Sequence, residues 1–376
     1  MVTHEGHEGN EGREGGLHAF DRRMMRRALF HAARGAGRTT PNPMVGAVVV
    51  SSDGIVVGHG WHERAGDAHA EVNALDDAGD RARGGTLYVT LEPCCHTGRT
   101  GPCTRRIIDA GLARVVAAMT DPDPRVSGHG FDELRSHGIV VENGLFEPQA
   151  RRLNAAFLTV KAQQRPLVLM KAAASLDARI AAGPGLRTAI SSKEANRRTH
   201  ILRASVDAVA IGSETLLVDD PLLTARECQR VRPLARVVFD RRLRANPKAR
   251  LFSTTSDGPV IIVTGSKSGE AAARAAALEH AGAEVMEASS LADSLQQLAA
   301  REISTLLVEG GPTLQAALVR ESLVDRLHLI VAPHLVGAAG IQWLGTESLD
   351  PFALSPVTIE PRGPDVWIEA DVHGHR

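Results

Sequence analysis

The chain has 376 residues, a formal net charge of −1 and only 3% aromatic residues. This length predicts two domains, because a single hydrophobic core stops growing near about 250–300 residues. The near-zero charge and scarce aromatic side chains argue against nucleic acid or an anionic membrane surface as a partner. No apolar run reaches the roughly 20 residues that span a bilayer. We therefore expect a small-molecule partner.

Composition also bears on the compartment and on the first residues. Three of the four cysteines fall within Cys94–Cys103, which is not the pattern of a disulfide scaffold and fits a reducing cytoplasm. Residues 1–16 repeat His-Glu-Gly-like triplets and lack the apolar segment of a secretory signal. We expect this segment to be a disordered tail, with metal binding through His4 and His7 as the alternative.

Strands and helices are expected to alternate in the first half, which predicts a largely covered α/β sheet. Asp21 is expected to cap the first helix, which ends near Gly35–Gly37. A tight turn at 52–54 predicts a hairpin. The expected strands are Met44–Val50, Ile55–Gly58, Thr86–Leu91, Arg114–Met119 and Ile139–Glu142. The further expected helices are His69–Ala78, Thr104–Ala110 and Phe131–His137.

A second α/β series follows a helical connector. Glu147–Lys161 has a helical pattern and the run 163–166 interrupts it, so we expect a domain over 17–148, a connector over 149–165 and a second domain over 166–376. The expected strands are Leu167–Ala172, Ala208–Ile211, Arg236–Asp240, Val260–Thr264, Glu284–Ala288, Thr305–Glu309, Arg326–Val331 and Val366–Ala370. The expected helices are Lys193–Ala204, Gly269–Ala281, Leu291–Arg301 and Leu314–Arg320. No internal repeat relates the halves, so we expect two different folds.

His69, Glu71, Cys94 and Cys103 carry the strongest chemical signal. One imidazole and two thiolates are the ligand types of a catalytic Zn²⁺ that keeps its fourth position open. Glu71 is too near His69 to be idle and would move protons rather than bind the metal, as in zinc-dependent base deaminases. Two of these ligands stand at expected helix starts and the third follows an expected strand, which predicts that they converge at a crevice.

The alternative is a structural zinc site with four protein ligands, of which Cys95 or His96 could be the fourth. Glu71 would have no role in such a site. The position directly after Pro93 favours Cys94 over Cys95 as the ligand. A catalytic zinc site is therefore the preferred interpretation.

The wider motif resembles a known family. Residues 90–103 read TLEPCCHTGRTGPC, with PNP at 41–43 and VG at 45–46 upstream, and this is similar to the deaminase half of the bifunctional riboflavin-biosynthesis deaminase–reductase. Nucleic-acid and free-cytidine deaminases typically close the site with Cys-x-x-Cys, whereas eight residues separate Cys94 from Cys103. The resemblance implies a cytidine-deaminase-like three-layer α/β/α domain over 17–148.

The resemblance also implies a reaction. It is the hydrolytic deamination of 2,5-diamino-6-(5-phosphoribosylamino)pyrimidin-4-one, with Zn²⁺ activating water and Glu71 moving the protons. The implied substrate contacts of this half are Asn42, His96 and Arg99.

The C-terminal half resembles the family's reductase half, whose α/β fold is like that of dihydrofolate reductase. Residues 309–313 form a glycine-rich turn suited to a dinucleotide, although an ordinary strand-to-helix turn has the same pattern. The resemblance implies NADPH-dependent reduction of the ribosyl arm to ribityl, giving 5-amino-6-(5-phosphoribitylamino)uracil. The residues implied at the NADPH site are Ala173, Ala189, Thr215, Asp219, Gly311, Pro312, Thr313 and Leu314. Those implied at the substrate are Arg187, Arg203, Leu223, Arg226 and Glu309, with Lys171 and Asp177 near the reacting centre.

One stretch departs from the family pattern. Where the family usually reads Gly-x-Ser-x-Trp-Ile-Thr/Ser, residues 185–191 read GLRTAIS. Ala189 thus stands in place of a tryptophan beside the cofactor, and Arg187 in place of a small substrate-contacting residue. The alternative to the bifunctional enzyme is therefore a deaminase with a degenerate reductase-like nucleotide-binding domain.

Two other classes of protein fit less well. A nucleic-acid base deaminase would need a basic groove and a Cys-x-x-Cys closure, and the sequence has neither. A non-enzymatic, zinc-stabilised nucleotide-binding module has only the changed stretch at 187–189 in its favour. The family resemblance further implies a homo-oligomer.

Overall fold

The computed structural model describes residues 8–96, 101–345 and 353–373, with side chains from Ala19 onward. The chain divides into two compact units, Met1–Ala162 and Gln163–Arg376, and each has its own hydrophobic core. The helices α5 (Glu147–Leu153) and α6 (Ala155–Gln163) occupy most of the expected connector, and the division falls near the end of α6. None of the described helices is both long and apolar enough to cross a membrane.

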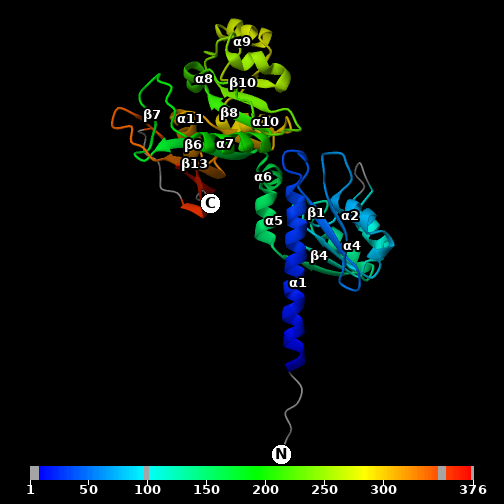
Figure 1. Cartoon of the computed structure of the whole chain (residues 1–376). Coiled ribbons are helices and arrows are strands. Elements are labelled where there is room, and N and C mark those ends of the chain that lie inside the picture. The colour runs from blue at the N-terminus through cyan, green and yellow to red at the C-terminus, as the bar shows by residue number, and fades with distance from the viewer. Residues whose placement is uncertain (1–7, 97–100, 346–352, 374–376) are drawn as a thin grey trace, which may run out of the picture. The chain divides into compact units, whose positions relative to one another are not determined.

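The first unit, drawn from blue through cyan to blue-green in Figure 1, is built on one five-stranded sheet. Its strand order is β2-β1-β3-β4-β5. Strand β1 runs antiparallel to β2 and β3, whereas β3, β4 and β5 are parallel. Its strands are β1 (Gly46–Val50), β2 (Val56–Trp61), β3 (Thr86–Val89), β4 (Arg114–Ala117) and β5 (Val140–Asn143). Its other helices are α1 (Glu8–Ala33), α2 (Ala70–Ala78), η1 (Gly79–Ala82), α3 (Cys103–Asp109) and α4 (His129–Ser136). Apart from the start of α1, the strands and helices predicted for this half are confirmed, with boundaries shifted by a few residues.

Two glycines explain how helices cover both faces of this sheet. A Cβ atom on Gly46 would lie 2.1 Å from the carbonyl oxygen of Ala28 in α1, and one on Gly60 would lie 2.6 Å from that of Ala70 in α2. Gly46 pairs with Trp61 across β1 and β2, so Gly46 and Gly60 point to opposite faces. Helices α1 and α2 therefore pack on opposite faces, so closely that a side chain at either glycine would clash with the helix backbone.

The first helix differs from its prediction at its N-terminal end, both in where it begins and in the role of Asp21. It begins at Glu8, within the segment expected to be a tail, because lengthening an existing helix costs much less than nucleating one. The prediction that Asp21 caps the helix is wrong. Asp21 lies inside α1 and is buried, and its carboxylate accepts hydrogen bonds from the Tyr88 hydroxyl (2.5 Å) and the Arg114 guanidinium (2.8 Å). The Asp21 carboxylate therefore contacts residues of β3 and β4 instead of the backbone N–H groups of a helix start.

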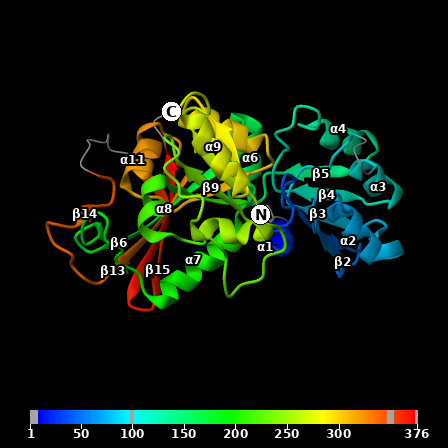
Figure 2. The same cartoon turned by 90° about the horizontal axis from the view of Figure 1, so that it is seen from above.

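The second unit is built on a nine-stranded sheet, of which β9, β6, β13 and β15 are labelled in Figure 2. Its strand order is β11-β10-β9-β8-β12-β6-β13-β16-β15. The strands from β11 to β13 run parallel, and β16 and β15 are added antiparallel at one edge. Its strands are β6 (Leu167–Ser175), β8 (Ala208–Gly212), β9 (Ala235–Phe239), β10 (Val260–Thr264), β11 (Ala283–Glu287), β12 (Thr305–Val308), β13 (Arg326–Ala332), β15 (Ala353–Arg362) and β16 (Asp365–His373). Because parallel strands end at the same edge, their carboxyl ends meet there.

The helices of the second unit largely match the prediction. They are α7 (Lys193–Ser205), α8 (Ser213–Asp219), η2 (Arg250–Asp257), α9 (Ala271–His280), α10 (Leu291–Ala299) and α11 (Pro312–Arg320). Ser192 and Ser290 cap α7 and α10, each accepting a hydrogen bond from a backbone N–H of the first turn. The sequence analysis missed α8, the strand β15 and the small sheet of β7 (Arg179–Ala181) with β14 (Ile341–Gln342).

Candidate active sites

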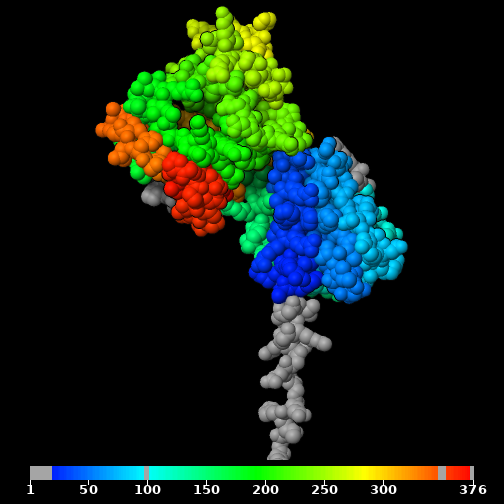
Figure 3. Space-filling view, viewed as in Figure 1, coloured from blue at the N-terminus to red at the C-terminus, as the bar shows by residue number. Residues whose placement is uncertain are grey.

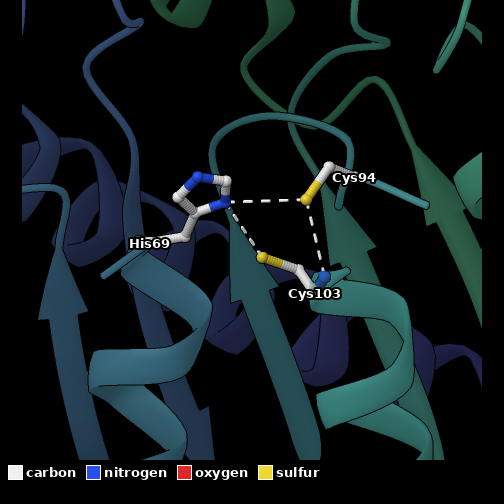
Figure 4. A group of neighbouring side chains, drawn as sticks. All are labelled: His69, Cys94 and Cys103. Carbon is white, nitrogen blue, oxygen red and sulfur yellow. Dashed lines mark hydrogen bonds between the residues drawn. The ribbon is translucent and has the colours of Figure 1, made fainter. Parts of the chain in front are cut away.

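Three side chains of the first unit that could bind a metal ion, His69, Cys94 and Cys103, lie close together beyond the end of β3 (Figure 4). His69 is the N-cap residue of α2, and Cys103 is the first residue of α3, after Pro102. Proline suits that position because its fixed φ leads into a helix and its missing N–H costs no hydrogen bond. Cys94 follows β3. Two helix starts and one strand end thus bring together the three residues predicted as zinc ligands.

The geometry of this group fits a zinc ion. The Nδ1 atom of His69 lies 3.2 Å from Sγ of Cys103 and 3.5 Å from Sγ of Cys94, and all three ligand atoms lie within 4.8 Å of one another. Ligands of a tetrahedral zinc, at about 2.0–2.3 Å from the ion, lie roughly 3.5–3.8 Å apart. The Cys103 thiol holds the pKa of Cys94 well below its usual range by hydrogen bonding, which favours the thiolate that binds metal.

The described residues favour an open fourth position. In the part of the chain that the structure covers, no further histidine, cysteine or carboxylate belongs to this group. The Cys95 thiol instead donates to the carbonyl oxygen of Arg125, at 3.7 Å. The Nδ1 atom of His96 is buried and has no hydrogen-bond partner among the described residues. Of the two adjacent cysteines, Cys94 is thus the one that lies in a group able to hold a metal ion.

Glu71 lies in the first turn of α2, beside the metal group, and is 3% exposed. Burial raises the pKa of Glu71 to about 7, the neighbouring Cys94 adds to this rise, and His69 opposes it. A carboxyl group with a pKa near neutrality can both accept and donate a proton. Its position and its pKa therefore suit acid–base chemistry next to a metal.

The structure describes two of the three residues expected to contact the deaminase substrate, Asn42 and His96. The Asn42 amide lies 3.1 Å from Nε2 of His62, whose ring is 5.7 Å from that of His69. Asn42 therefore contacts His62, and His62 lies beside the proposed metal ligand His69. His62, which the sequence analysis missed, is buried and also contacts the carbonyl oxygen of Ala68. Arg99 lies outside the described residues.

The second unit contains a cavity of about 1400 Å³ at the carboxyl ends of its parallel strands. Every residue expected at the NADPH site lines this cavity, including Thr215 and Asp219 of α8 and the turn from Gly311 to Leu314. Gly311 is the N-cap of α11, so the turn presents backbone N–H groups at a helix N-terminus, where phosphate binds favourably. Such a volume accommodates a dinucleotide and a substrate together.

A cluster of charges lies on one wall of this cavity. The Arg203 guanidinium pairs with the Glu309 carboxylate through two hydrogen bonds of 2.6 and 2.9 Å, and both side chains are nearly buried. Burial lowers the pKa of Lys171, and Glu309 opposes this change. Burial alone would raise the pKa of Glu309, but Arg203 and Lys171 hold it below its usual range. The carboxylate is thus the counter-charge for both cations.

Most residues expected at the reductase substrate also line the main cavity, and Arg226 is an exception. Arg187, Arg203 and Leu223 line both the main cavity and a neighbouring hollow of about 320 Å³, which Arg226 lines as well. Arg187 opposes the burial-driven rise in the pKa of Asp219, so these two lining residues are electrostatically coupled. Ala189, in place of the family's tryptophan, lines the main cavity.

Asp177, expected near the reacting centre, makes several hydrogen bonds in the structure. It is not among the residues that line the described cavity. Its carboxylate accepts hydrogen bonds from the Ser175 hydroxyl (2.6 Å) and from the backbone N–H groups of Val336 (3.1 Å) and Gly337 (2.7 Å). These bonds hold the pKa of Asp177 well below its usual range. Asp177 thus ties the turn after β6 to the loop after β13, and its expected place near the reacting centre stays a prediction.

Several lining residues escaped the sequence analysis because they come from strand ends far apart in the chain. Arg241 and Arg244 follow β9, Thr264 ends β10, and Ser289 and Ser290 follow β11. Arg244 contacts Glu214 (3.2 Å) and the Ser213 hydroxyl (2.7 Å), whereas no carboxylate within the described ranges pairs with Arg241. Because active sites of parallel sheets lie at the carboxyl ends of the strands, the two arginines after β9 could have been predicted to bind an anionic ligand.

Comparison with known proteins gives matches over both units. Residues 18–119 match the model of the cytidine and deoxycytidylate deaminase zinc-binding region, and residues 166–368 match that of the RibD C-terminal domain. The riboflavin biosynthesis protein RibD of Aquifex aeolicus is 41% identical over 337 residues, which cover 89% of this chain and 93% of that protein. RibD of Escherichia coli is 40% identical over 373 residues, covering 93% of this chain and 98% of that protein.

Solved structures match over most of the chain. RibD of Acinetobacter baumannii has a TM-score of 0.84 at 33% identity, covering 95% of this chain and 99% of that one. A diaminohydroxyphosphoribosylaminopyrimidine deaminase/5-amino-6-(5-phosphoribosylamino)uracil reductase from Thermotoga maritima also has a TM-score of 0.84 at 33% identity, covering 95% and 100%. These matches confirm the predicted order of a deaminase-type domain followed by a reductase-type domain. The chain therefore belongs to the RibD family, whose members are riboflavin-biosynthesis enzymes with a zinc-binding deaminase domain and an NADPH-dependent reductase domain.

Proposed function

We propose that the first unit deaminates 2,5-diamino-6-(5-phosphoribosylamino)pyrimidin-4-one, with His69, Cys94 and Cys103 as the zinc ligands. The observation that carries this proposal is the three-ligand group of tetrahedral spacing beside the buried carboxyl group of Glu71. Zinc, when bound there, supplies a Lewis acid and lowers the pKa of its water.

In this mechanism Glu71 is the group that moves protons. It would accept one proton from the water whose oxygen bonds to the ring carbon and deliver that proton to the ring nitrogen. The second proton of the water would then pass to the amino group, which leaves as ammonia when its C–N bond breaks. The carbonyl of the product takes its oxygen from the water, so the atoms balance. Asn42, His96 and Arg99 are proposed to bind the pyrimidine and its phosphorylated arm.

We propose that the cavity of the second unit reduces the ribosyl arm of the deaminated product to ribityl. The cofactor, when bound, supplies a hydride. The turn at Gly311 binds its pyrophosphate at the N-terminus of α11, and Ala173, Thr215 and Asp219 line its site. Arg187 and Arg226 suit the substrate's phosphate, since guanidinium groups bind phosphate bidentately, whereas Arg203 is paired with Glu309 and is proposed to face the substrate from that pair. The buried Lys171–Glu309–Arg203 cluster marks the reacting end of the cavity.

An assay that follows both products tests the whole proposal. Purified protein receives the diaminopyrimidinone ribosyl phosphate, with and without NADPH. Without NADPH, only ammonia and the deaminated ribosylamino compound are expected; with NADPH, the ribitylamino compound and an equal amount of NADP⁺ follow. Removing zinc with a chelator should stop ammonia release yet leave reduction of pre-deaminated substrate intact. Deamination without any reduction would instead support the deaminase-only alternative.

Arg241 is proposed to select NADPH over NADH. Lys171, Gly311 and Arg241 line the same cavity, and if Gly311 holds the pyrophosphate and Lys171 lies at the reacting end, Arg241 would hold the adenosine end of the cofactor. A charge-assisted hydrogen bond from Arg241 to the 2′-phosphate, which NADPH has and NADH lacks, would contribute about 1.5–3 kcal/mol. Arg241→Gln is therefore expected to weaken NADPH binding roughly 10- to 100-fold and leave NADH binding within about twofold, measured by calorimetry. Arg242→Gln, an exposed neighbour outside the cavity, is the control; equal losses for both cofactors would contradict this assignment.

We further propose that the chain forms a homodimer through β15. In the described part of the sheet β15 is the last strand, and Val357 and Ile359 on it are 49% and 66% exposed; the β15–β16 hairpin is drawn red in Figure 3. A long exposed edge strand with apolar side chains invites pairing with another chain. Ile359→Lys is expected to convert a dimer to a monomer in light scattering, whereas Thr358→Lys should have a smaller effect. A monomeric parent protein would refute the proposal.

The compartment is proposed to be the cytoplasm. All four cysteines are free in the structure, and two of them are proposed zinc ligands that must stay reduced.

A further inference from the structure

The carboxylate of Glu92 has an unusual set of partners. It is 3% exposed, and its two oxygens together accept hydrogen bonds from four backbone N–H groups. Asp121 (3.2 Å) and Gly128 (3.0 Å) donate to Oε2, and Gly130 (3.0 Å) and Phe131 (3.4 Å) donate to Oε1. These donors span the loop after β4 and the first turn of α4. Glu92 therefore binds that whole segment, although it belongs to the turn after β3.

The same segment presses directly on the turn that carries Cys94. A Cβ atom on Gly130 would lie 2.1 Å from the carbonyl oxygen of Pro93. The backbone N–H of Glu92 donates to the carbonyl oxygen of Met119 (2.9 Å), which fixes the start of the turn to the end of β4. The path from residue 92 to residue 94 is thus enclosed on the side of β4 and α4.

Thr104 fixes the other side of this turn. Its backbone N–H (3.2 Å) and its hydroxyl (3.4 Å) both donate to the carbonyl oxygen of Cys94, and Thr104 is fully buried. Thr104 follows Cys103, so these bonds join the two cysteine-bearing segments. Cys94 therefore has two attachments, one to α3 through Thr104 and one to the α4 loop through Glu92.

We propose that Glu92 is a positioning residue for the zinc site: by binding the 121–131 segment it fixes the Glu92-Pro93-Cys94 turn, and thereby the Cys94 thiolate. This rests on the zinc ligand set proposed above. Glu92 is not one of the three ligand residues and acts through Cys94. A glutamine would keep the shape but turn an N–H₂ group toward backbone N–H donors, leaving two of the four without an acceptor. Groups that orient metal ligands typically contribute 10- to 100-fold to metal affinity.

The test compares full-length wild type with Glu92→Gln and Glu92→Asp. Zinc affinity is measured by competition with a coloured chelator, and cobalt is substituted for zinc so that thiolate charge-transfer and d–d absorption report the ligand geometry. Glu92→Gln is expected to weaken zinc binding roughly 10- to 100-fold and to alter the cobalt spectrum. Glu92→Asp keeps both acceptor oxygens on a shorter stem, so its affinity should fall between the two.

Asp21→Asn is the matched control. Asp21 is also a buried carboxylate of the first unit, but it pairs with Tyr88 and Arg114, and Arg114 begins β4 at the opposite end of the parallel strands from Cys94. This variant should lower the melting temperature yet keep wild-type zinc affinity, within about twofold, and a wild-type cobalt spectrum. This control therefore separates a general loss of protein stability from a change in the position of the Cys94 thiolate.

Each outcome decides between the proposals. If wild type binds one zinc and both Glu92 variants keep wild-type affinity and cobalt spectrum, Glu92 is only a structural residue and this inference is wrong. If Glu92→Gln does not fold, Glu92→Asp decides by the same two readouts. If wild type itself fails to bind a stoichiometric zinc, the ligand set of the proposed function fails instead.

Discussion

Glu71→Gln is expected to abolish deamination while leaving one zinc bound per chain. The amide keeps the size of the carboxyl group but cannot accept a proton from water. General acid–base groups contribute about 10²–10⁴-fold to a rate, and Glu71 is proposed to act in more than one proton transfer, so we expect kcat for ammonia release to fall by at least about 10³-fold. NADPH oxidation with pre-deaminated substrate should stay at the wild-type rate.

Asp76→Asn on the same helix is the control for this prediction. Asp76 lies on α2 but is exposed and pairs with Arg106, so its loss should leave both activities within about twofold of wild type. Two results would contradict the proposed division of labour. One is a Glu71→Gln protein that retains more than a tenth of its deaminase activity; the other is the loss of the reductase together with the deaminase.

The metal group could be predicted from the sequence because its chemistry is local. Each ligand sits at an element boundary that short patterns reveal: His69 before a helix, Cys94 after a strand, Cys103 after a proline. Few residue types bind zinc, so three of them in such places are informative. The turn at Gly311 was predictable for the same reason, since a glycine-rich run between a strand and a helix favours phosphate.

Other features depend on tertiary contacts that no short pattern contains. Asp21 looked like a helix cap, but its partners Tyr88 and Arg114 lie far along the chain. Glu92 likewise finds its four donors on a loop about thirty or more positions away. Such partners are set by the strand order β3-β4, which brings distant loops together at one edge.

The strand β15 was missed for a different reason. Its sequence contains Pro356 and Pro361, and proline inside a strand pattern argues against a central strand. Because β15 is at the edge of the described sheet, an N–H that faces outward is not needed for pairing, and proline is tolerated there. An edge strand with two prolines therefore lacks the pattern by which a central strand is recognised in a sequence.

Glu309→Gln is expected to damage the reductase and the stability of the second unit, and to spare the deaminase. Glu309 is the counter-charge for Arg203, and it opposes the burial-driven fall in the pKa of Lys171. Removing one partner of a buried pair leaves an uncompensated charge and costs about 3–5 kcal/mol. Since glutamine keeps one acceptor oxygen for Arg203, we expect a loss near the lower end, about 3 kcal/mol, in the free energy of unfolding.

The activity of the same variant should fall further than its stability explains. Without Glu309 the two cations repel each other and shift from the positions in which they would bind the ribosyl arm, so kcat/KM for NADPH-dependent reduction should drop at least about 100-fold in folded protein. Glu279→Gln is the matched control, because it breaks an exposed pair with Lys267 and should cost less than about 1 kcal/mol without affecting either activity. A Glu309→Gln protein with wild-type unfolding and wild-type reduction would mean that the buried charge cluster does not mark the reacting end of the cavity.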